Sequence, residues 1–186
     1  MWAYGVLAIV LVVAAATDIR RGKIYNMATY PAIAIGFIGH TLEGGMAYQS
    51  EHQLGLIGSA CGFAAGFGPM LAAWLAGGVG GGDAKLMGAV GALAGWRFAL
   101  AAMFFGFAVA ALMAVVVMLR RRIVKRTVGR ILRFVYLIFT PSRPADPATA
   151  DSPKVAFGLA LCIGSALALV EVLLKGRMAG KLWFGI

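Results

Sequence analysis

Six apolar segments occupy most of this 186-residue chain, and this pattern restricts its possible folds to those of membrane proteins. Hydrophobic residues make up 61% of the sequence, and the mean hydropathy is +0.87. A soluble domain of this size needs more polar surface than that. We therefore predict an all-α, polytopic membrane protein, with residues 1–186 forming a single domain. The predicted membrane helices cover residues 2–17, 27–42, 54–76, 84–96, 98–119 and 155–174.

Length alone does not decide whether every segment crosses the membrane. A spanning helix needs about 20 residues, within a range of about 17–25, and the segment 84–96 is clearly shorter. The basic residues favour six crossings. With the N-terminus outside, thirteen of the seventeen Lys and Arg residues lie on the cytoplasmic side, as membrane proteins prefer. If 84–96 did not cross, the cluster beginning at Arg120 would lie opposite Arg20 and Arg21, and this bias would largely vanish.

The net charge of +10 belongs to a membrane protein, so it indicates topology and contact with anionic lipid rather than nucleic-acid binding. Much of it falls in a predicted cytoplasmic loop, about residues 120–154. Within this loop, residues 120–140 mix basic and apolar side chains, which fits an amphipathic helix on the inner leaflet or a cytoplasmic extension of the preceding helix. Residues 141–153 form a proline-rich linker.

The start of the sequence and its two cysteines give little further information about the fold. The first four residues lack the positive charge that opens a signal peptide, so we expect the first apolar segment to remain as a membrane helix. Cys61 and Cys162 both lie in apolar runs. We expect them to be buried small side chains, without a disulfide or a zinc framework.

Two of the seven acidic residues lie at the ends of apolar segments, where a charge is costly unless it has a use. Asp18 ends the first segment. Asp83 follows the glycine run Gly80-Gly81-Gly82, which leaves the backbone free to adopt positive φ and lets a substrate strand approach. Taken alone, Asp18 is better explained by an ion pair with Arg20 or Arg21. A helix N-cap explains Asp83 but not the glycines before it.

Two carboxylates at one membrane face predict a pair that shares one proton. Close carboxylates cannot both ionise cheaply, so one stays protonated. The ionised member can then deprotonate a water, and the protonated member can donate to the carbonyl of a peptide bond. This chemistry needs no metal and no cofactor. His40 and His52 fall on the opposite side and are interpreted as loop residues, and a serine mechanism is poorly supported.

Glycines also recur along the predicted helices. Gly58, Gly62 and Gly66 repeat every four residues in the third segment, a spacing that lets another helix backbone approach closely. The short fourth segment is similarly thin. Lys85, two residues after Asp83, either lowers the pKa of the aspartate pair or extends to the membrane interface, and the second role is favoured.

These residues resemble the motifs of the type IV prepilin peptidases. Residues 80–91, Gly-Gly-Gly-Asp-Ala-Lys-Leu-Met-Gly-Ala-Val-Gly, are similar to the GxGD motif of that family. Residues 18–26, Asp18 to Asn26, resemble its first-aspartate motif. A weaker match is the stretch 154–160, which contains Gly158 and resembles the family's motif at the start of the last helix.

The resemblance implies a six-helix GxGD aspartyl protease with Asp18 and Asp83 as its catalytic pair. It implies motif or substrate-binding roles for Gly80, Gly81, Gly82, Lys85, Asn26 and Gly158. The implied substrate is a prepilin or pseudopilin, whose short basic leader is cut on the cytoplasmic side of the bacterial inner membrane, or of an archaeal membrane.

Some features depart from the family pattern. Tyr25 stands where the first-aspartate motif has proline, and Ala156 stands where the last motif has one, with Pro153 displaced upstream. The chain has no paired CxxC motifs and no room for the cytoplasmic domain of the long members. It therefore resembles the short, peptidase-only type found with Flp/Tad pili, and N-methyltransferase activity is not expected.

Other functions stay open at this point. A small transporter, or a non-catalytic membrane subunit of a pilus or secretion machine, would use residues 80–83 as a broken helix lining a path. Many transporters contain internal inverted repeats, and none is visible in this sequence, so a transporter is the less favoured interpretation. A family member that binds pilins without cutting them is a third possibility.

Overall fold

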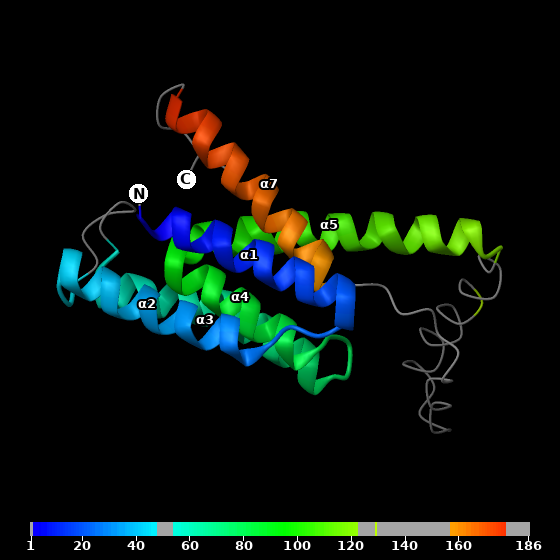
Figure 1. Cartoon of the computed structure of the whole chain (residues 1–186), viewed down its shortest axis with the longest axis horizontal. Helices are drawn as coiled ribbons and strands as arrows, with labels where there is room; N and C mark the ends of the chain where they lie inside the picture. The colour runs from blue at the N-terminus through cyan, green and yellow to red at the C-terminus, as the bar shows by residue number, and fades with distance from the viewer. Residues whose placement is uncertain (1, 48–53, 123–128, 130–156, 178–186) are drawn as a thin grey trace. The chain divides into compact units, whose positions relative to one another are not determined.

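The chain is all-helical wherever its computed structural model describes it, at residues 2–47, 54–122, 129 and 157–177. The membrane helices predicted from the apolar segments are all present and in the predicted order (Figure 1). Their bounds are α1 Trp2–Arg21, α2 Asn26–Gly44, α3 Gly55–Leu75, α4 Gly81–Ala94, α5 Trp96–Arg120 and α7 Phe157–Arg177.

Four of these helices are long and apolar enough to cross a membrane: α1, α3, α5 and residues Phe157–Leu174 of α7. The helices α2 and α4 do not meet both conditions, so the prediction of six crossings is not confirmed. For α4 the reason is its length. At 1.5 Å per residue its 14 residues span about 20 Å, less than the roughly 30 Å hydrocarbon core.

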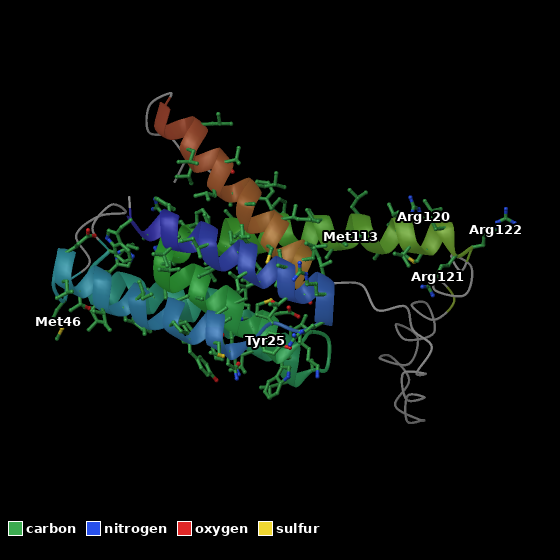
Figure 2. The ribbon with its side chains drawn as sticks, in the orientation of Figure 1. Tyr25, Met46, Met113, Arg120, Arg121 and Arg122 are labelled. Carbon is green, nitrogen blue, oxygen red and sulfur yellow. The ribbon has the colours of Figure 1, made fainter. Side chains whose placement is uncertain are left out.

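The chain divides into two compact units. One unit comprises Met1–Val109 with Ala156–Ile186, and the other comprises Ala110–Val155. Helix α5 therefore begins in the first unit and ends in the second, where Arg120, Arg121 and Arg122 are exposed at its C-terminal end (Figure 2). Most of the predicted basic loop 120–154, and with it the predicted amphipathic helix, lies outside the described residues.

Helix α4 forms the centre of the first unit. Nearly every side chain from Asp83 to Leu93 is buried, and the helix contacts α1, α2, α3 and α7. A helix that is buried on all sides needs apolar or small residues all round, and Gly88, Gly91 and the alanines of α4 supply them. Protein rather than lipid covers this helix, which explains how so short a segment fits the bundle.

The predicted glycine packing of the third segment is confirmed where α3 meets α4. A Cβ atom on Gly62 would collide with the backbone carbonyl of Gly91, and one on Gly66 would collide with that of Met87. The converse holds for Gly91, whose Cβ would meet the carbonyl of Gly62. The two backbones therefore approach as closely as glycine permits.

Polar contacts hold α2 and α3 to the far end of α4. The His40 ring lies 2.9 Å from the carbonyl oxygen of Leu93, and the Ser59 hydroxyl donates a hydrogen bond to the carbonyl of Ala92. The interpretation of His40 as a loop residue was wrong, because it lies buried within α2 and packs against the Trp2 ring. His52 lies outside the described residues.

The cysteine prediction is half right. Cys162 is buried in α7, and Cys61 is exposed on α3. An apolar run does not fix which side of a membrane helix faces the bundle, because lipid accepts apolar side chains as readily as the protein core does.

Candidate active site

Asp18 lies in the last turn of α1 and is 8% exposed. Its Oδ2 atom accepts a hydrogen bond from the backbone N–H of Leu159, at 2.7 Å, in the first turn of α7. The N–H groups at a helix start have no partner within the helix, and this carboxylate supplies one. The alternative that Asp18 pairs with Arg20 or Arg21 is not supported, because the described residues show no such ion pair, and the Arg21 guanidinium donates to the Tyr25 hydroxyl at 2.8 Å.

Asp83 lies in the first turn of α4 and is 9% exposed. Its Oδ2 atom accepts a hydrogen bond from the backbone N–H of Gly80 at 3.1 Å, as in a capping box. Asp83 therefore folds back over the glycine run, and its carboxylate lies at the positive end of its own helix.

The two carboxylates meet over Gly158, in the first turn of α7. A Cβ atom placed on Gly158 would lie 2.9 Å from Asp18 Oδ2 and 2.9 Å from Asp83 Oδ1. These two oxygens are therefore separated by no more than twice that distance. The two carboxylates can approach this closely over α7 only because residue 158 has no side chain.

Asp18 lies in the last turn of α1, but two other helices begin beside the carboxylates. The backbone N–H of Leu159, at the start of α7, donates to Asp18, and the backbone N–H of Gly80, the residue before α4, donates to Asp83. Both helix dipoles stabilise negative charge there. The site can therefore hold one carboxylate ionised even though both aspartates are largely buried.

The glycines before Asp83 serve close packing rather than unusual backbone angles. None of Gly80, Gly81 and Gly82 has a positive φ, so the backbone freedom predicted for them is not used in this structure. A Cβ on Gly82 would lie 3.1 Å from the Cβ of Ile24, and one on Gly81 would lie 3.3 Å from Nε1 of Trp74. The absent side chains let the loop after α1 and the end of α3 close around the start of α4.

Ile24 is a site residue that the sequence did not reveal. Its side chain contacts Gly82, and its Cδ1 atom would lie 2.8 Å from a Cβ on Gly158. It therefore forms an apolar wall beside both carboxylates. Ile24 lies within the first-aspartate motif 18–26, but a single isoleucine between Lys23 and Tyr25 carries no periodic signal that would place its side chain in the site.

Lys85 and Asn26 pair with each other rather than with the aspartates. The Lys85 ammonium donates to the Asn26 side-chain oxygen at 2.9 Å and lies 5.0 Å from the centre of the Tyr30 ring. This contact joins the start of α2 to the first turn of α4. Lys85 thus lies at the rim of the site, consistent with the favoured interface role.

The arrangement offers acid–base chemistry. Two carboxyl groups border one small space and each is oriented by a backbone N–H group, so one can accept a proton while the other donates one. Within the residues that the structure describes, no group of three or more His, Cys, Asp or Glu side chains is placed to hold a metal ion.

Comparison with known proteins identifies a family. A protein-family model described as the type IV leader peptidase family matches residues 5–116, which include both aspartates and end before α7. No curated protein and no solved structure matches the chain significantly.

Proposed function

Because the chain belongs to the type IV leader peptidase family, we propose that it is an aspartic endopeptidase whose catalytic pair is Asp18 and Asp83. The observation that carries this proposal is the meeting of the two carboxylates over Gly158.

In the proposed mechanism, one proton is shared between the two carboxyl groups. The ionised group removes a proton from a water, whose oxygen bonds to the carbonyl carbon of the scissile peptide. The protonated group donates to the carbonyl oxygen, which gives a tetrahedral intermediate. When this intermediate breaks down, the C–N bond breaks and the departing nitrogen takes a proton from one carboxyl group. A hydroxyl of the intermediate returns a proton to the other carboxylate as the new C=O bond forms, which restores the shared proton. The hydrogen bonds from Leu159 and Gly80 hold both carboxylates in place throughout.

We place the site at the cytoplasmic end of the bundle. Arg20, Arg21 and Lys85 lie near the aspartates, whereas Arg97 follows Gly95 at the opposite end, beside Leu54. The positive-inside rule then puts the aspartates on the cytoplasmic side of the inner membrane. Helices α3 and α5 are candidate spans that both begin at the opposite end. Because α4 joins the end of α3 to the start of α5, it carries the chain back toward the opposite end of the bundle.

The proposed substrate is a prepilin of the Flp type, a short basic leader followed by an apolar helix. A peptide bond inside a helix is shielded by the helix hydrogen bonds, so the leader must unwind near residues 80–82 before it can be cut. In this proposal, the contacts that Ile24 and Trp74 make with the glycines must loosen to admit an extended backbone beside the carboxylates.

Membrane vesicles test the activity and its side together. The probe is a water-soluble fluorogenic peptide that carries a basic leader and the first residues of a Flp-type pilin. Inverted vesicles, which expose the cytoplasmic face, should cleave it at the leader junction. Right-side-out vesicles should leave it intact until detergent is added. Absence of cleavage in detergent would contradict the proposed activity, and cleavage by sealed right-side-out vesicles would contradict the proposed orientation.

A further inference from the structure

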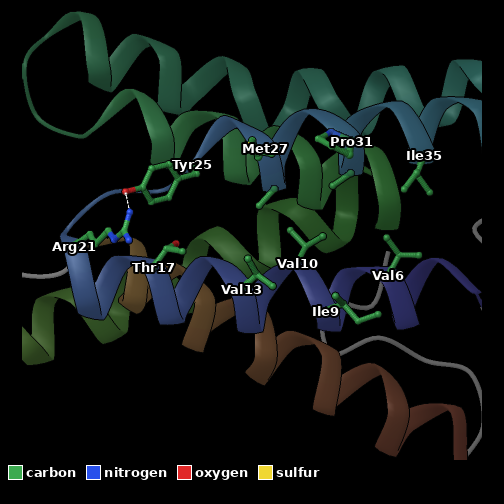
Figure 3. Close-up of a pocket in the computed structure, with 12 residues that line it drawn as sticks. Val6, Ile9, Val10, Val13, Thr17, Arg21, Tyr25, Met27, Pro31 and Ile35 are labelled. Carbon is green, nitrogen blue, oxygen red and sulfur yellow. Dashed lines mark hydrogen bonds between the residues drawn. The ribbon is translucent and has the colours of Figure 1, made fainter.

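An apolar groove of about 670 Å³ runs between α1 and α2 on the first unit (Figure 3). Val10 and Val13 line it from α1, and Pro31 and Ile35 line it from α2. Several lining side chains are well exposed, so nothing in the described part of the chain covers the groove. Its volume is that of a typical small-molecule site.

One end of the groove is cationic. Arg21 and Tyr25 close it, joined by their hydrogen bond, and the Arg21 guanidinium lies 5.6 Å from the centre of the Tyr25 ring (Figure 3). A second cavity of about 280 Å³ lies at this end. It shares Thr17, Arg21 and Tyr25 with the groove and adds Ala16 and Arg20. A long apolar groove thus leads into a smaller cavity with two guanidinium groups and two hydroxyls.

We propose that these joined cavities bind one anionic phospholipid of the inner leaflet. An acyl chain lies in the groove, and the phosphate accepts hydrogen bonds from Arg20, Arg21 and the Tyr25 hydroxyl. The groove suits the acyl chain because both are apolar. The smaller cavity suits the phosphate because a guanidinium group can donate two parallel hydrogen bonds to phosphate oxygens. Arg20 and Arg21 end a candidate membrane span, the level at which lipid headgroups lie.

Charge favours a lipid over the substrate helix as the occupant. An apolar pilin helix also suits the groove walls, but its basic leader would then lie against Arg20 and Arg21, and like charges disfavour such a complex. This comparison and the assignment to the inner leaflet rest on the proposed function, whereas the binding of an anionic lipid by the groove and the cationic cavity does not. Tyr25 stands where the family motif has proline, which has no hydroxyl group. The hydrogen bond from the Tyr25 hydroxyl to the phosphate would therefore be particular to this protein.

Native mass spectrometry of the full chain in detergent tests the headgroup contacts. The probes are phosphatidylglycerol and phosphatidylcholine with identical acyl chains. The protein should retain one phosphatidylglycerol in preference to phosphatidylcholine. Each basic residue at a membrane surface contributes about 1 kcal/mol to the binding of anionic lipid, so the double variant Arg20→Gln/Arg21→Gln should bind phosphatidylglycerol roughly 10- to 30-fold more weakly. The control Arg120→Gln/Arg121→Gln removes the same charge elsewhere and should retain it. Equal retention of both lipids, or equal loss in both double variants, would overturn the proposal.

Photocrosslinking tests the groove. Phosphatidylglycerol with a diazirine on its acyl chain should label α1 and α2, and Val13→Trp, which fills the groove, should reduce this labelling severalfold. Val12→Trp is the matched control, because Val12 is exposed on the same helix but does not line the groove. Excess inorganic phosphate should not displace the lipid. The proposal fails if both tryptophan variants label alike, if phosphate alone displaces the lipid, or if a prepilin peptide displaces it from the groove.

Discussion

Asp18→Asn and Asp83→Asn are each expected to cleave a prepilin leader at least about 10³-fold more slowly than the unaltered protein, because each removes one half of the proton-sharing pair. Asparagine keeps the shape of the side chain. Its oxygen still accepts the hydrogen bond from Leu159 or Gly80, so the helix starts stay capped. The loss therefore reports proton chemistry rather than folding. Initial rates on purified protein measure it.

Glu43→Gln is the matched control for these variants. Glu43 is an exposed carboxylate near the end of α2, and its replacement also removes one negative charge from the protein. This control should cleave at the normal rate. Normal cleavage by either aspartate variant, with all proteins accumulating equally in the membrane, would show that the pair is not catalytic.

Gly158→Ala is expected to lower the cleavage rate by about 10²-fold or more, because catalysis falls steeply when reacting groups are displaced by about 1 Å. The new methyl group would lie 2.9 Å from an oxygen of each aspartate and 2.8 Å from Cδ1 of Ile24. These side chains must move apart, and the methyl group then occupies the space where water and the peptide bond have to meet. The effect should fall on kcat, measured with the same peptide.

The folded state should survive this substitution. Alanine is a better helix former than glycine by about 1 kcal/mol, and Gly158 lies in the first turn of α7. Gly68→Ala is the control, since a Cβ on Gly68 meets nothing within 4 Å in α3. It should leave the rate unchanged. If Gly158→Ala cleaves at the normal rate, the space over Gly158 is not where the reaction takes place.

The sequence predicted the helices because hydropathy records which segments lie in lipid or in the core. It also predicted that Asp18 and Asp83 lie at one end of the bundle, since each stands at the end of an apolar segment and helices alternate in direction. That placement used the lengths and order of the apolar segments together with the distribution of the basic residues.

The finer contacts of the site could not be predicted. The hydrogen bond from Leu159 to Asp18 joins residues 141 positions apart, and no local pattern encodes which backbone N–H will face a carboxylate. The role of Gly158 depends on how α7 packs against α1, and that of Ile24 depends on the path of a short loop. The burial of His40 was missed for a similar reason. Its hydrogen-bond partner is a backbone carbonyl of α4, and because every residue has a backbone carbonyl, the sequence does not mark this one as a partner.

Crosslinking between positions 18 and 83 measures whether the Asp18 and Asp83 side chains lie next to each other. Both aspartates are replaced by cysteine in a protein whose Cys61 and Cys162 are alanine, and the membranes are treated with a short bifunctional thiol reagent. A protease site engineered between α2 and α3 reveals the link on a gel. We expect a rapid intramolecular crosslink between positions 18 and 83, and none between positions 43 and 83. Failure of the 18–83 pair to crosslink, although each cysteine reacts singly, would contradict this arrangement of the two aspartates.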